Sequence, residues 1–438
     1  MPIEQRGTER EYYLIAFGAD GGERADDTDA LMSDKIAERL RTNAVTDVFV
    51  FSHGWRGDVE AAKDQYNKWV TAMVHCTQDL QRIRQLRPAF RALLIGVHWP
   101  SEPWGEEDFG GPAAFGVPRL NVDAQTDQWA DRIAGTPAAR QALRTILQAA
   151  ADDPTPQTMP ERVRGAYEAL NREAGLCSEG PSGAPGEDRA PFDPERAYQD
   201  SFDTGVDFGT GPSLGSLLTP LKLLSFWKMK ARARRLGEES AHQLLCRLLT
   251  IKGKDHVRFH LMGHSFGCIV VTSMVAGPLD AEGPPRPVSS MALVQGALSH
   301  WSFCNDIPVA PGRPGYFWPF IKRHDVAGPV VVTTSQHDRA LNFWYPKAAG
   351  AAGHVDFDPQ QPPTYGAVGI FGVRGPGIDV VPLQMKGANE GYGLKPLKVY
   401  NLGGDDVIKQ GDFFSGAHSD IAHPEVAHAV WEAVMAAP

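Results

Sequence analysis

A serine flanked by glycines is the segment of this sequence best suited to chemistry. The pentapeptide GHSFG, residues 263–267, follows a short apolar segment, 257–262, and precedes a helix-like segment, 268–276. A sharp turn between a strand and a helix exposes a serine hydroxyl, and the glycines leave room for the neighbouring strand and helix. This context predicts that Ser265 is a nucleophile; the alternative is a serine that merely begins a buried helix.

The pattern Gly-x-Ser-x-Gly is weak evidence without its context. The chain has 45 glycines, and a second match occurs at residues 211–215. The segment before it, 204–209, is not an apolar strand, and Pro212 favours a loop because it lacks a backbone donor. We therefore interpret Ser213 as a loop serine.

An activated serine needs a base, and the base needs a carboxylate to orient it. Two apolar segments follow the serine motif, 291–294 and 330–334, and the second leads into Asp338. A carboxylate at the end of a buried strand can face a site above the sheet, so Asp338 is the favoured acid. The alternative role is a turn or helix cap. The other candidate acids are Asp306, Asp405 and Asp406.

The candidate base lies near the C-terminus. The last expected strand, 397–402, is followed by a loop that carries His418 and then by a helix from about 424 to 437. A base on a loop can approach a serine on another element, so we predict His418 as the base; the alternative is a solvent-facing histidine. His423 precedes a proline in the first turn of the helix, and His428 lies within it.

A fourth element lies upstream of the serine. The apolar segment 48–51 ends in the tripeptide His53-Gly54-Trp55. Backbone N–H groups at such a strand end, together with that of the residue after the serine, can stabilise a developing oxyanion. The donors would be the backbones of Trp55 and Phe266. We expect His53, Gly54 and His264 to border the substrate.

These motifs, in this order, resemble those of the α/β-hydrolase superfamily, and within it the serine esterases and lipases. The resemblance spans nearly the whole chain, with long interruptions, and implies a doubly wound, mostly parallel sheet with helices on both faces. It also implies a Ser265–His418–Asp338 triad. One departure is that residues 53–56 contain fewer glycines than the His-Gly-Gly-Gly of some lipases and esterases, so a tryptophan ring lies near the expected acyl pocket.

Two insertions interrupt the expected core, which comprises residues 1–98 and 238–438. We interpret 99–237 as an inserted cap and 345–377 as a second loop insertion near the site, because long connections are usually functional. The cap contains a basic segment in which Leu217, Leu221, Leu224 and Trp227 recur at helical spacing. Such an apolar stripe most often packs against the protein core, and this is the favoured interpretation. The alternative is a lid that meets a membrane surface. Leu224 and Trp227 are expected to contribute to the substrate site.

Composition limits the possible functions. The chain has 438 residues, a net charge of −10 and five cysteines, which argues against nucleic-acid binding and a disulfide framework. We expect a cytoplasmic enzyme, because no signal peptide or membrane-spanning segment is apparent. No zinc, phosphate-binding or dinucleotide motif is present, so no metal or cofactor is expected.

The leading hypothesis is a serine hydrolase that cleaves small-molecule or lipid esters through an acyl-enzyme. The alternatives are an interfacial lipase or phospholipase gated by the cap, an amidase that uses the same triad, and a non-catalytic interaction protein on a hydrolase scaffold. The third alternative is disfavoured because all three residues of the expected triad are present. The oligomeric state is open.

Overall fold

A nine-stranded sheet with the order β1-β2-β4-β3-β5-β6-β7-β9-β8 organises the computed structural model of the chain. All neighbouring strands are parallel except β1 and β2. The strands are β1 (Ile3–Glu4), β2 (Tyr12–Ala16), β3 (Asp47–Ser52), β4 (Ala92–His98), β5 (Arg258–His264), β6 (Ser290–Val294), β7 (Val330–Thr334), β8 (Val380–Gln384) and β9 (Val399–Gly403). The structure describes residues 3–25, 30–55, 59–101, 121–153, 156–203, 216–251, 253–345, 362–411 and 416–438.

The chain divides into two compact units. The first, which contains the sheet, comprises Met1–Glu102, Arg232–Pro346 and His354–Pro438. Its helices are α1 (Met32–Thr42), α2 (Val59–His75), α3 (Thr77–Leu86), the π-helix η3 (Gly237–Ala241), α9 (His242–Leu249), α10 (Gly267–Ala276), α11 (Trp318–Lys322), the π-helix η4 (Ala340–Trp344), α13 (Val368–Phe371), the 3₁₀-helix η5 (Ala417–Ser419) and α14 (Pro424–Met435).

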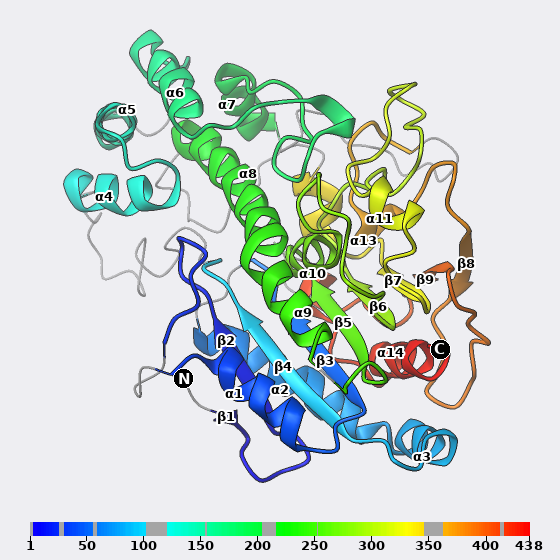
Figure 1. Cartoon of the computed structure of the whole chain (residues 1–438). Coiled ribbons are helices and arrows are strands. Elements are labelled where there is room, and N and C mark those ends of the chain that lie inside the picture. Colours follow the sequence, from blue (N-terminus) through cyan, green and yellow to red (C-terminus); the bar gives the residue numbers. More distant parts are fainter. Residues whose placement is uncertain are drawn as a thin grey trace. The chain divides into compact units, whose positions relative to one another are not determined.

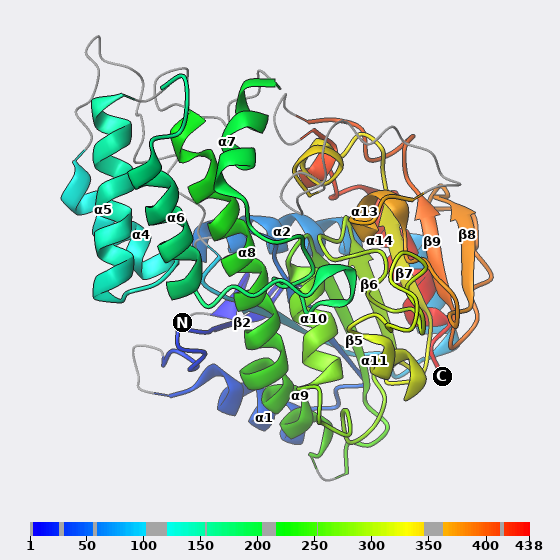
Figure 2. The ribbon, with the colours of Figure 1, turned by 90° about the horizontal axis from the view of Figure 1, so that it is seen from above.

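Helices cover both faces of the sheet. Helices α2, α3 and α14 lie on one face, and α1, α9 and α10 lie on the other (Figures 1 and 2). The strands β2, β3, β5 and β6 are buried almost throughout, as expected for a parallel sheet that is covered on both sides. Alternate strand residues, such as Phe49 and Phe51, pack against Trp69 of α2 and Trp431 of α14. The architecture is therefore α/β, as predicted.

The second unit comprises Pro103–Ala231 and Lys347–Gly353. Its helices are α4 (Val122–Arg132), α5 (Pro137–Asp152), α6 (Glu161–Glu173), the 3₁₀-helices η1 (Gly180–Ser182) and η2 (Ser216–Leu218), and α7 (Pro194–Asp203), while α8 (Thr219–Leu236) continues from this unit into the first. Thr136 caps α5 by accepting the Ala139 N–H at 3.1 Å, and Pro137 occupies the first turn.

The apolar stripe of the basic segment is buried in the structure. Leu217, Leu221, Leu224 and Trp227 are each fully buried, which is the core interpretation of the stripe. Lys230 of the same basic segment is buried as well. Its ammonium is fully buried and donates to Asp188 at 2.5 Å, because a buried cation needs a paired anion.

Two local features of the fold depend on tertiary contacts. Helices α2 and α3 follow one another along the chain but are separated at Cys76. The Trp431 indole donates to the Met73 carbonyl at 3.0 Å, which places a side-chain hydrogen bond where the helical ladder would continue. Strand β8 has Pro382 at its centre. A proline is tolerated there because β8 is an edge strand.

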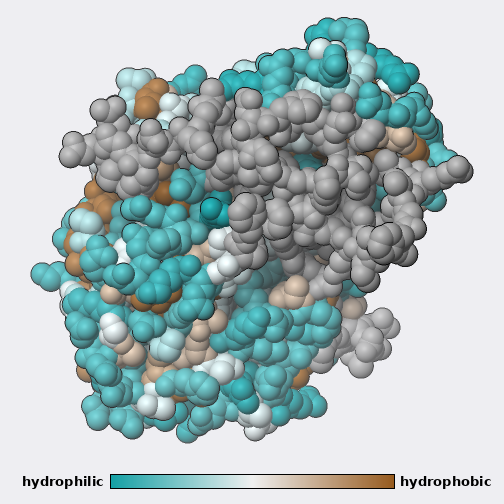
Figure 3. Space-filling model, turned by 180° about the vertical axis from the view of Figure 1, so that it is seen from behind, coloured by the Kyte–Doolittle hydropathy of each residue, from teal (hydrophilic) through white to brown (hydrophobic). Residues whose placement is uncertain are grey.

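One face of the molecule is largely hydrophilic where it is coloured (Figure 3). Figure 3 shows one face, on which hydrophilic residues cover most of the coloured surface and hydrophobic residues form small separate groups. Among the described residues, no helix is both long enough and apolar enough to cross a membrane.

A buried polar cluster joins the amino ends of the central strands. Asp47 of β3 accepts from Arg87 at 3.1 Å and from His260 of β5 at 3.2 Å, and its other oxygen accepts from Thr46 at 2.5 Å. The second ring nitrogen of His260 lies 2.7 Å from the Ser290 hydroxyl at the start of β6. The cluster therefore ties together three strands.

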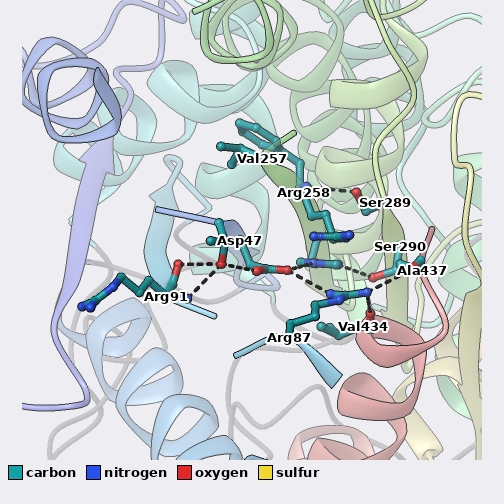
Figure 4. Close-up of polar contacts among 12 residues, drawn as sticks. Asp47, Arg87, Arg91, Val257, Arg258, Ser289, Ser290, Val434 and Ala437 are labelled. Carbon is teal, nitrogen blue, oxygen red and sulfur yellow. Dashed lines mark hydrogen bonds and ion pairs between the residues drawn. The ribbon is translucent and has the colours of Figure 1, made fainter. Parts of the chain in front are cut away.

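The same cluster fixes the end of the chain. The guanidinium of Arg87 lies between Asp47 and the carbonyls of Val434 and Ala437, to which it donates at 3.1 and 2.8 Å (Figure 4). The Val434 carbonyl lies in the last turn of α14 and the Ala437 carbonyl just beyond it, where a cation also interacts favourably with the helix dipole. Arg87 thus fastens α14 to the sheet.

The protonation states in this cluster follow from burial and hydrogen bonding. Burial disfavours the charged carboxylate of Asp47, but hydrogen bonds from His260 and Thr46 and the charge of Arg87 outweigh it, so its pKa lies below the ordinary 3.8. Burial lowers the pKa of His260 below 6.5. The ring is therefore neutral, with Nε2–H donating to Asp47 and Nδ1 accepting the Ser290 hydroxyl.

We predict that Asp47→Asn destabilises the protein by about 3 kcal/mol, because it leaves the half-buried Arg87 without its anion. The measurement is urea denaturation followed by circular dichroism. A carboxyl with a depressed pKa stabilises the fold above its unfolded pKa, and that contribution is lost as the pH falls through the folded pKa. The difference between the variant and the wild type should therefore shrink below about pH 4.

Asp34→Asn is the matched control, because its ion pair with Arg247 lies at the surface, with side chains 57% and 44% exposed. It should leave the denaturation midpoint unchanged at every pH. Equal effects of the two substitutions would contradict the role assigned to the cluster.

Candidate active site

Three side chains that are far apart in the sequence meet at the carboxyl edge of the sheet. The Ser265 hydroxyl oxygen lies 2.8 Å from Nε2 of His418, and Nδ1 of His418 lies 2.7 Å from Oδ2 of Asp338. Ser265 is 5% exposed and Asp338 is fully buried, while the His418 side chain is 14% exposed. The structure thus brings together the three residues that the sequence predicts as nucleophile, base and acid.

Ser265 sits in a strained turn between β5 and α10. Its φ is 56°, in the left-handed region that non-glycine residues rarely adopt. The flanking glycines are required by close backbone approach. A Cβ on Gly263 would lie 2.4 Å from the Gly267 carbonyl oxygen, and one on Gly267 would lie 2.2 Å from that of Ser52. The turn therefore packs directly against the end of β3.

Asp338 is held by hydrogen bonds to both carboxylate oxygens. It follows β7 by a short turn, as predicted from its place after a buried strand. Its Oδ1 accepts the Leu341 N–H at 2.9 Å, and its Oδ2 faces His418. The helix-capping role that we considered as an alternative therefore coexists with the contact to the histidine.

The segment that carries His418 is docked on the turn that carries Asp338. The Ala417 N–H donates to the His337 carbonyl at 2.9 Å. Gly416 makes this approach possible, since a Cβ there would lie 2.4 Å from the same carbonyl oxygen. The spacing between His418 and Asp338 is thus set by main-chain contacts as well as by their own hydrogen bond.

His264 also fixes His418, through the backbone. Its Nε2 donates to the His418 carbonyl at 2.8 Å, and the two rings are 4.8 Å apart. Burial, together with the nearby His418, places the pKa of His264 well below 6.5. A neutral ring with its proton on Nε2 is the form that this hydrogen bond requires.

His53 organises the backbone that follows β3. Its Nδ1–H donates to the Gly54 carbonyl at 2.8 Å, so Nε2 is an acceptor, and the Trp99 N–H and the His98 ring lie 3.3 and 3.1 Å from it. Burial lowers the pKa of His53 to about 3, so the ring stays neutral. His53 is 1% exposed, and its hydrogen bonds hold the Gly54–Trp55 peptide.

The expected oxyanion donors come from two neighbouring strand ends. Trp55 follows Gly54 after β3, and Phe266 is the N-cap residue of α10, where the positive end of the helix dipole favours a developing negative charge. The two aromatic rings are 5.8 Å apart. A Cβ on Gly54 would lie 2.7 Å from that of Ser265, so the strand end directly abuts the serine.

The rival candidates from the sequence lie elsewhere. Asp306 accepts the Gly312 N–H in an exposed turn, Asp405 accepts the Gln336 N–H, and Asp406 is exposed. His423 is the N-cap residue of α14, as predicted, and bonds to Asp420. Ser213 lies outside the described residues, as do parts of both insertions.

One group of side chains has the spacing of metal ligands. In the part of the chain that the structure describes, Asp79, His428 and Glu432 bring their ligand atoms within 4.8 Å of one another. Both ring nitrogens of His428 face acceptors, the Asp79 carboxylate at 2.8 Å and the Glu390 carbonyl at 3.0 Å. Burial opposes the charged ring, but these hydrogen bonds outweigh it and raise its pKa above 6.5. Arg82 pairs with both Asp79 and Glu432, so these carboxylates already have a cationic partner in the structure.

Two residues that contact Asp338 or its neighbours were not predicted. Gln295 follows β6 directly and donates to Oδ2 of Asp338 at 3.0 Å, and Thr333 of β7 bonds to Gln295. The sequence contains a pattern that could have identified Gln295 as a site residue, because it is a polar residue at the end of a buried strand. The same rule identified Asp338.

No family model, curated protein or solved structure matches this chain. The chemistry of the site must therefore be argued from its own geometry.

We predict that Ser265 reacts with a fluorophosphonate probe, because its hydroxyl can pass a proton to His418 as the oxygen attacks phosphorus and fluoride leaves. Peptide mass spectrometry should locate the label on Ser265, and Ser265→Ala should abolish it. Ser290→Ala is the matched control, since Ser290 also contacts a histidine but is buried in the amino-edge cluster. A label on Ser290 would contradict the assignment.

We predict that Gly54→Ala slows this labelling by about 100-fold, because the added methyl group would displace Ser265 or the donors beside it. Gly135→Ala should label at the wild-type rate, since a Cβ there has no atom within 4 Å. Wild-type labelling of Gly54→Ala, measured as a second-order rate constant, would show that the close approach is unimportant.

Proposed function

We propose that this protein is a serine hydrolase of the α/β-hydrolase fold that cleaves carboxylic esters. The observation that carries the proposal is the chain of two short hydrogen bonds, from Ser265 to His418 and from His418 to Asp338, at a strained turn between a strand and a helix. The order of these residues and their places at strand ends support the same conclusion. In this proposal, the unit formed by residues 103–231 is the inserted cap.

The proposed reaction begins when the Ser265 oxygen attacks the ester carbonyl and its proton moves to Nε2 of His418. Asp338 holds the ring with its proton on Nδ1 and stabilises the imidazolium that forms. The backbone N–H groups of Trp55 and Phe266 are the proposed donors to the oxyanion. Collapse of the tetrahedral species breaks the bond to the alcohol oxygen, which leaves with the proton from His418.

The second half of the reaction regenerates the enzyme. His418 removes a proton from water, the hydroxide attacks the acyl carbonyl, and the bond to Ser265 breaks as the serine takes the proton back. The products are a carboxylic acid and an alcohol, and no cofactor takes part. The arrangement of residues suits an ester or an amide, and the ester is proposed as the more readily cleaved substrate.

The interfacial alternative has less support. Its basis in the sequence was the basic amphipathic segment, whose apolar stripe is buried and whose Lys230 is paired with Asp188. An esterase acting on dissolved substrates needs no exposed apolar face. Activity that rises steeply when the substrate forms micelles would favour the interfacial alternative instead.

We predict that the wild type hydrolyses p-nitrophenyl acetate and that Ser265→Ala, His418→Ala and the double variant each lose about 10³-fold or more in kcat/KM. The double variant should be no worse than the single variants, because the residues act as a unit. Release of p-nitrophenol measures the rate, and circular dichroism checks folding.

Ser290→Ala is again the control, and it should retain wild-type kcat/KM. Undiminished hydrolysis by Ser265→Ala would remove the proposal. A panel of esters of increasing acyl length would then define the substrate range of the wild type.

A further inference from the structure

The amide side chain of Gln295 connects the candidate acid to the end of strand β6. Gln295 is fully buried, and its Nε2 donates to Oδ2 of Asp338 at 3.0 Å and lies 3.3 Å from the Gly369 carbonyl. The same Oδ2 accepts from His418 at 2.7 Å. One carboxylate oxygen is therefore shared between the candidate base and a buried amide.

The chemistry of its neighbours fixes the orientation of this amide. The Asp338 carboxylate and the Gly369 carbonyl can only accept, so the NH₂ group must face them. Thr333 completes the arrangement, because its hydroxyl donates to Oε1 of Gln295 at 2.9 Å and accepts the Gln295 backbone N–H at 3.0 Å. A flipped amide would turn an oxygen toward the carboxylate, which is unfavourable in a buried site.

The backbone at Gln295 is strained and is connected to the serine turn. Its φ is 45°, a second non-glycine residue in the left-handed region at this edge of the sheet besides Ser265. The Ser265 N–H donates to the Val294 carbonyl, and the Ala297 N–H donates to the Ser265 carbonyl, both at 3.1 Å. Strain of this kind costs about 1–3 kcal/mol and persists where the surroundings enforce it, often at functional sites.

Gly369 of α13 lets the chain close over this point. A Cβ on Gly369 would lie 2.7 Å from the Gln295 carbonyl carbon, and the Gly369 N–H donates to the Gly296 carbonyl at 2.9 Å. The residue is thus held from three sides, by β6, by Thr333 of β7 and by α13. Such confinement keeps the amide in one rotamer.

We propose that Gln295 is a positioning residue for the hydrolytic reaction, which holds Oδ2 of Asp338 in line with Nδ1 of His418 and shares the negative charge of that oxygen. The inference rests on the proposed function. Oδ1 is already held by the Leu341 N–H, so the second oxygen would otherwise be fixed by His418 alone. His418 must gain and lose a proton in each cycle, whereas the amide of Gln295 donates throughout.

A positioning role and a purely structural role predict different effects on the pH dependence of kcat/KM. Loss of the amide donor concentrates negative charge on Oδ2, which favours the imidazolium form of His418. The acidic limb of the plot of kcat/KM against pH should therefore move to higher pH. A residue that only fills space would change stability without changing this limb.

The test uses Gln295→Met, which keeps the length of the side chain and removes both polar atoms. We expect kcat to fall by about 10- to 100-fold, the range for one lost hydrogen bond to a charged group, with KM changed less than twofold. In an Asp338→Asn background, Gln295→Met should have no further effect on kcat, because the carboxylate through which Gln295 acts has been removed. Equal fold-losses in both backgrounds would overturn the proposal.

Asn401→Leu is the matched control. Its amide is also held on both sides, by the Val373 N–H and carbonyl at 3.0 Å, and it bonds to a loop rather than to the acid. It should lower the melting temperature without moving the acidic limb. Thr333→Val should move the limb in the same direction as Gln295→Met, but less, because the amide loses its orienting partner. A shift of the limb in Asn401→Leu equal to that in Gln295→Met would contradict the positioning role.

A spectroscopic measurement separates this inference from the proposed function. The Nδ1 proton of His418 should give a downfield proton resonance in the wild type, assigned by its loss in Asp338→Asn, and Gln295→Met should shift it. The wild type could prove inactive while Gln295→Met still shifts the resonance. That result would refute the proposed hydrolysis but leave the Gln295–Asp338–His418 coupling intact. A resonance that is unmoved in Gln295→Met would overturn the positioning role, whatever the activity.

Discussion

The site depends on a turn that has no room for side chains. Gly263 and Gly267 let the start of α10 pass against the ends of β5 and β3, with distances from their ideal Cβ positions to backbone oxygens of only 2.4 and 2.2 Å. Because the turn is this tight, Ser265 is forced to a φ of 56°. The same packing brings Gly54 against the serine. The position of the nucleophile, the placement of the expected oxyanion donors and the start of α10 thus have one steric cause.

The sheet carries two Ser–His–Asp arrangements, one at each edge, and their surroundings separate their roles. At the amino edge, Ser290 donates to a neutral His260 whose other nitrogen bonds to Asp47, and Arg87 balances the carboxylate. All of that group except Arg87 is nearly or fully buried. At the carboxyl edge the histidine side chain remains 14% exposed and lies in the short 3₁₀-helix η5. The proposed catalysis therefore requires more than contact between these three residue types: it also requires reach from solvent and a base that can exchange its proton.

One rule predicted most of the site from the sequence: polar residues soon after an apolar strand lie together. The rule holds because the carboxyl ends of parallel strands meet at one edge of the sheet. Ser265 and Asp338 follow this rule, and His418 could be placed by order and by its loop. Gln295 obeys it too, but an amide is not an expected acid or base, so its contact with Asp338 emerges only in three dimensions. The break between α2 and α3 could not be predicted, since it depends on a hydrogen bond from Trp431, more than 300 residues away in the chain. Strand β8 was not among the strands named from the sequence, and its central Pro382 is acceptable only because the strand lies at an edge of the sheet.

The groups of the proposed chemistry all belong to the first unit. The groups that would react lie at the ends of β3, β5 and β7 and after β9, and each is fixed by main-chain contacts within the first unit, such as the Ala417 N–H to His337 and the Ser265 N–H to Val294. The second unit enters the chain between β4 and β5. The main-chain contacts named above come from residues of the first unit, so the spacing of the three side chains is set within that unit. This spacing defines the chemistry that we propose, whereas the identity of the substrate is a separate property that a fold does not determine.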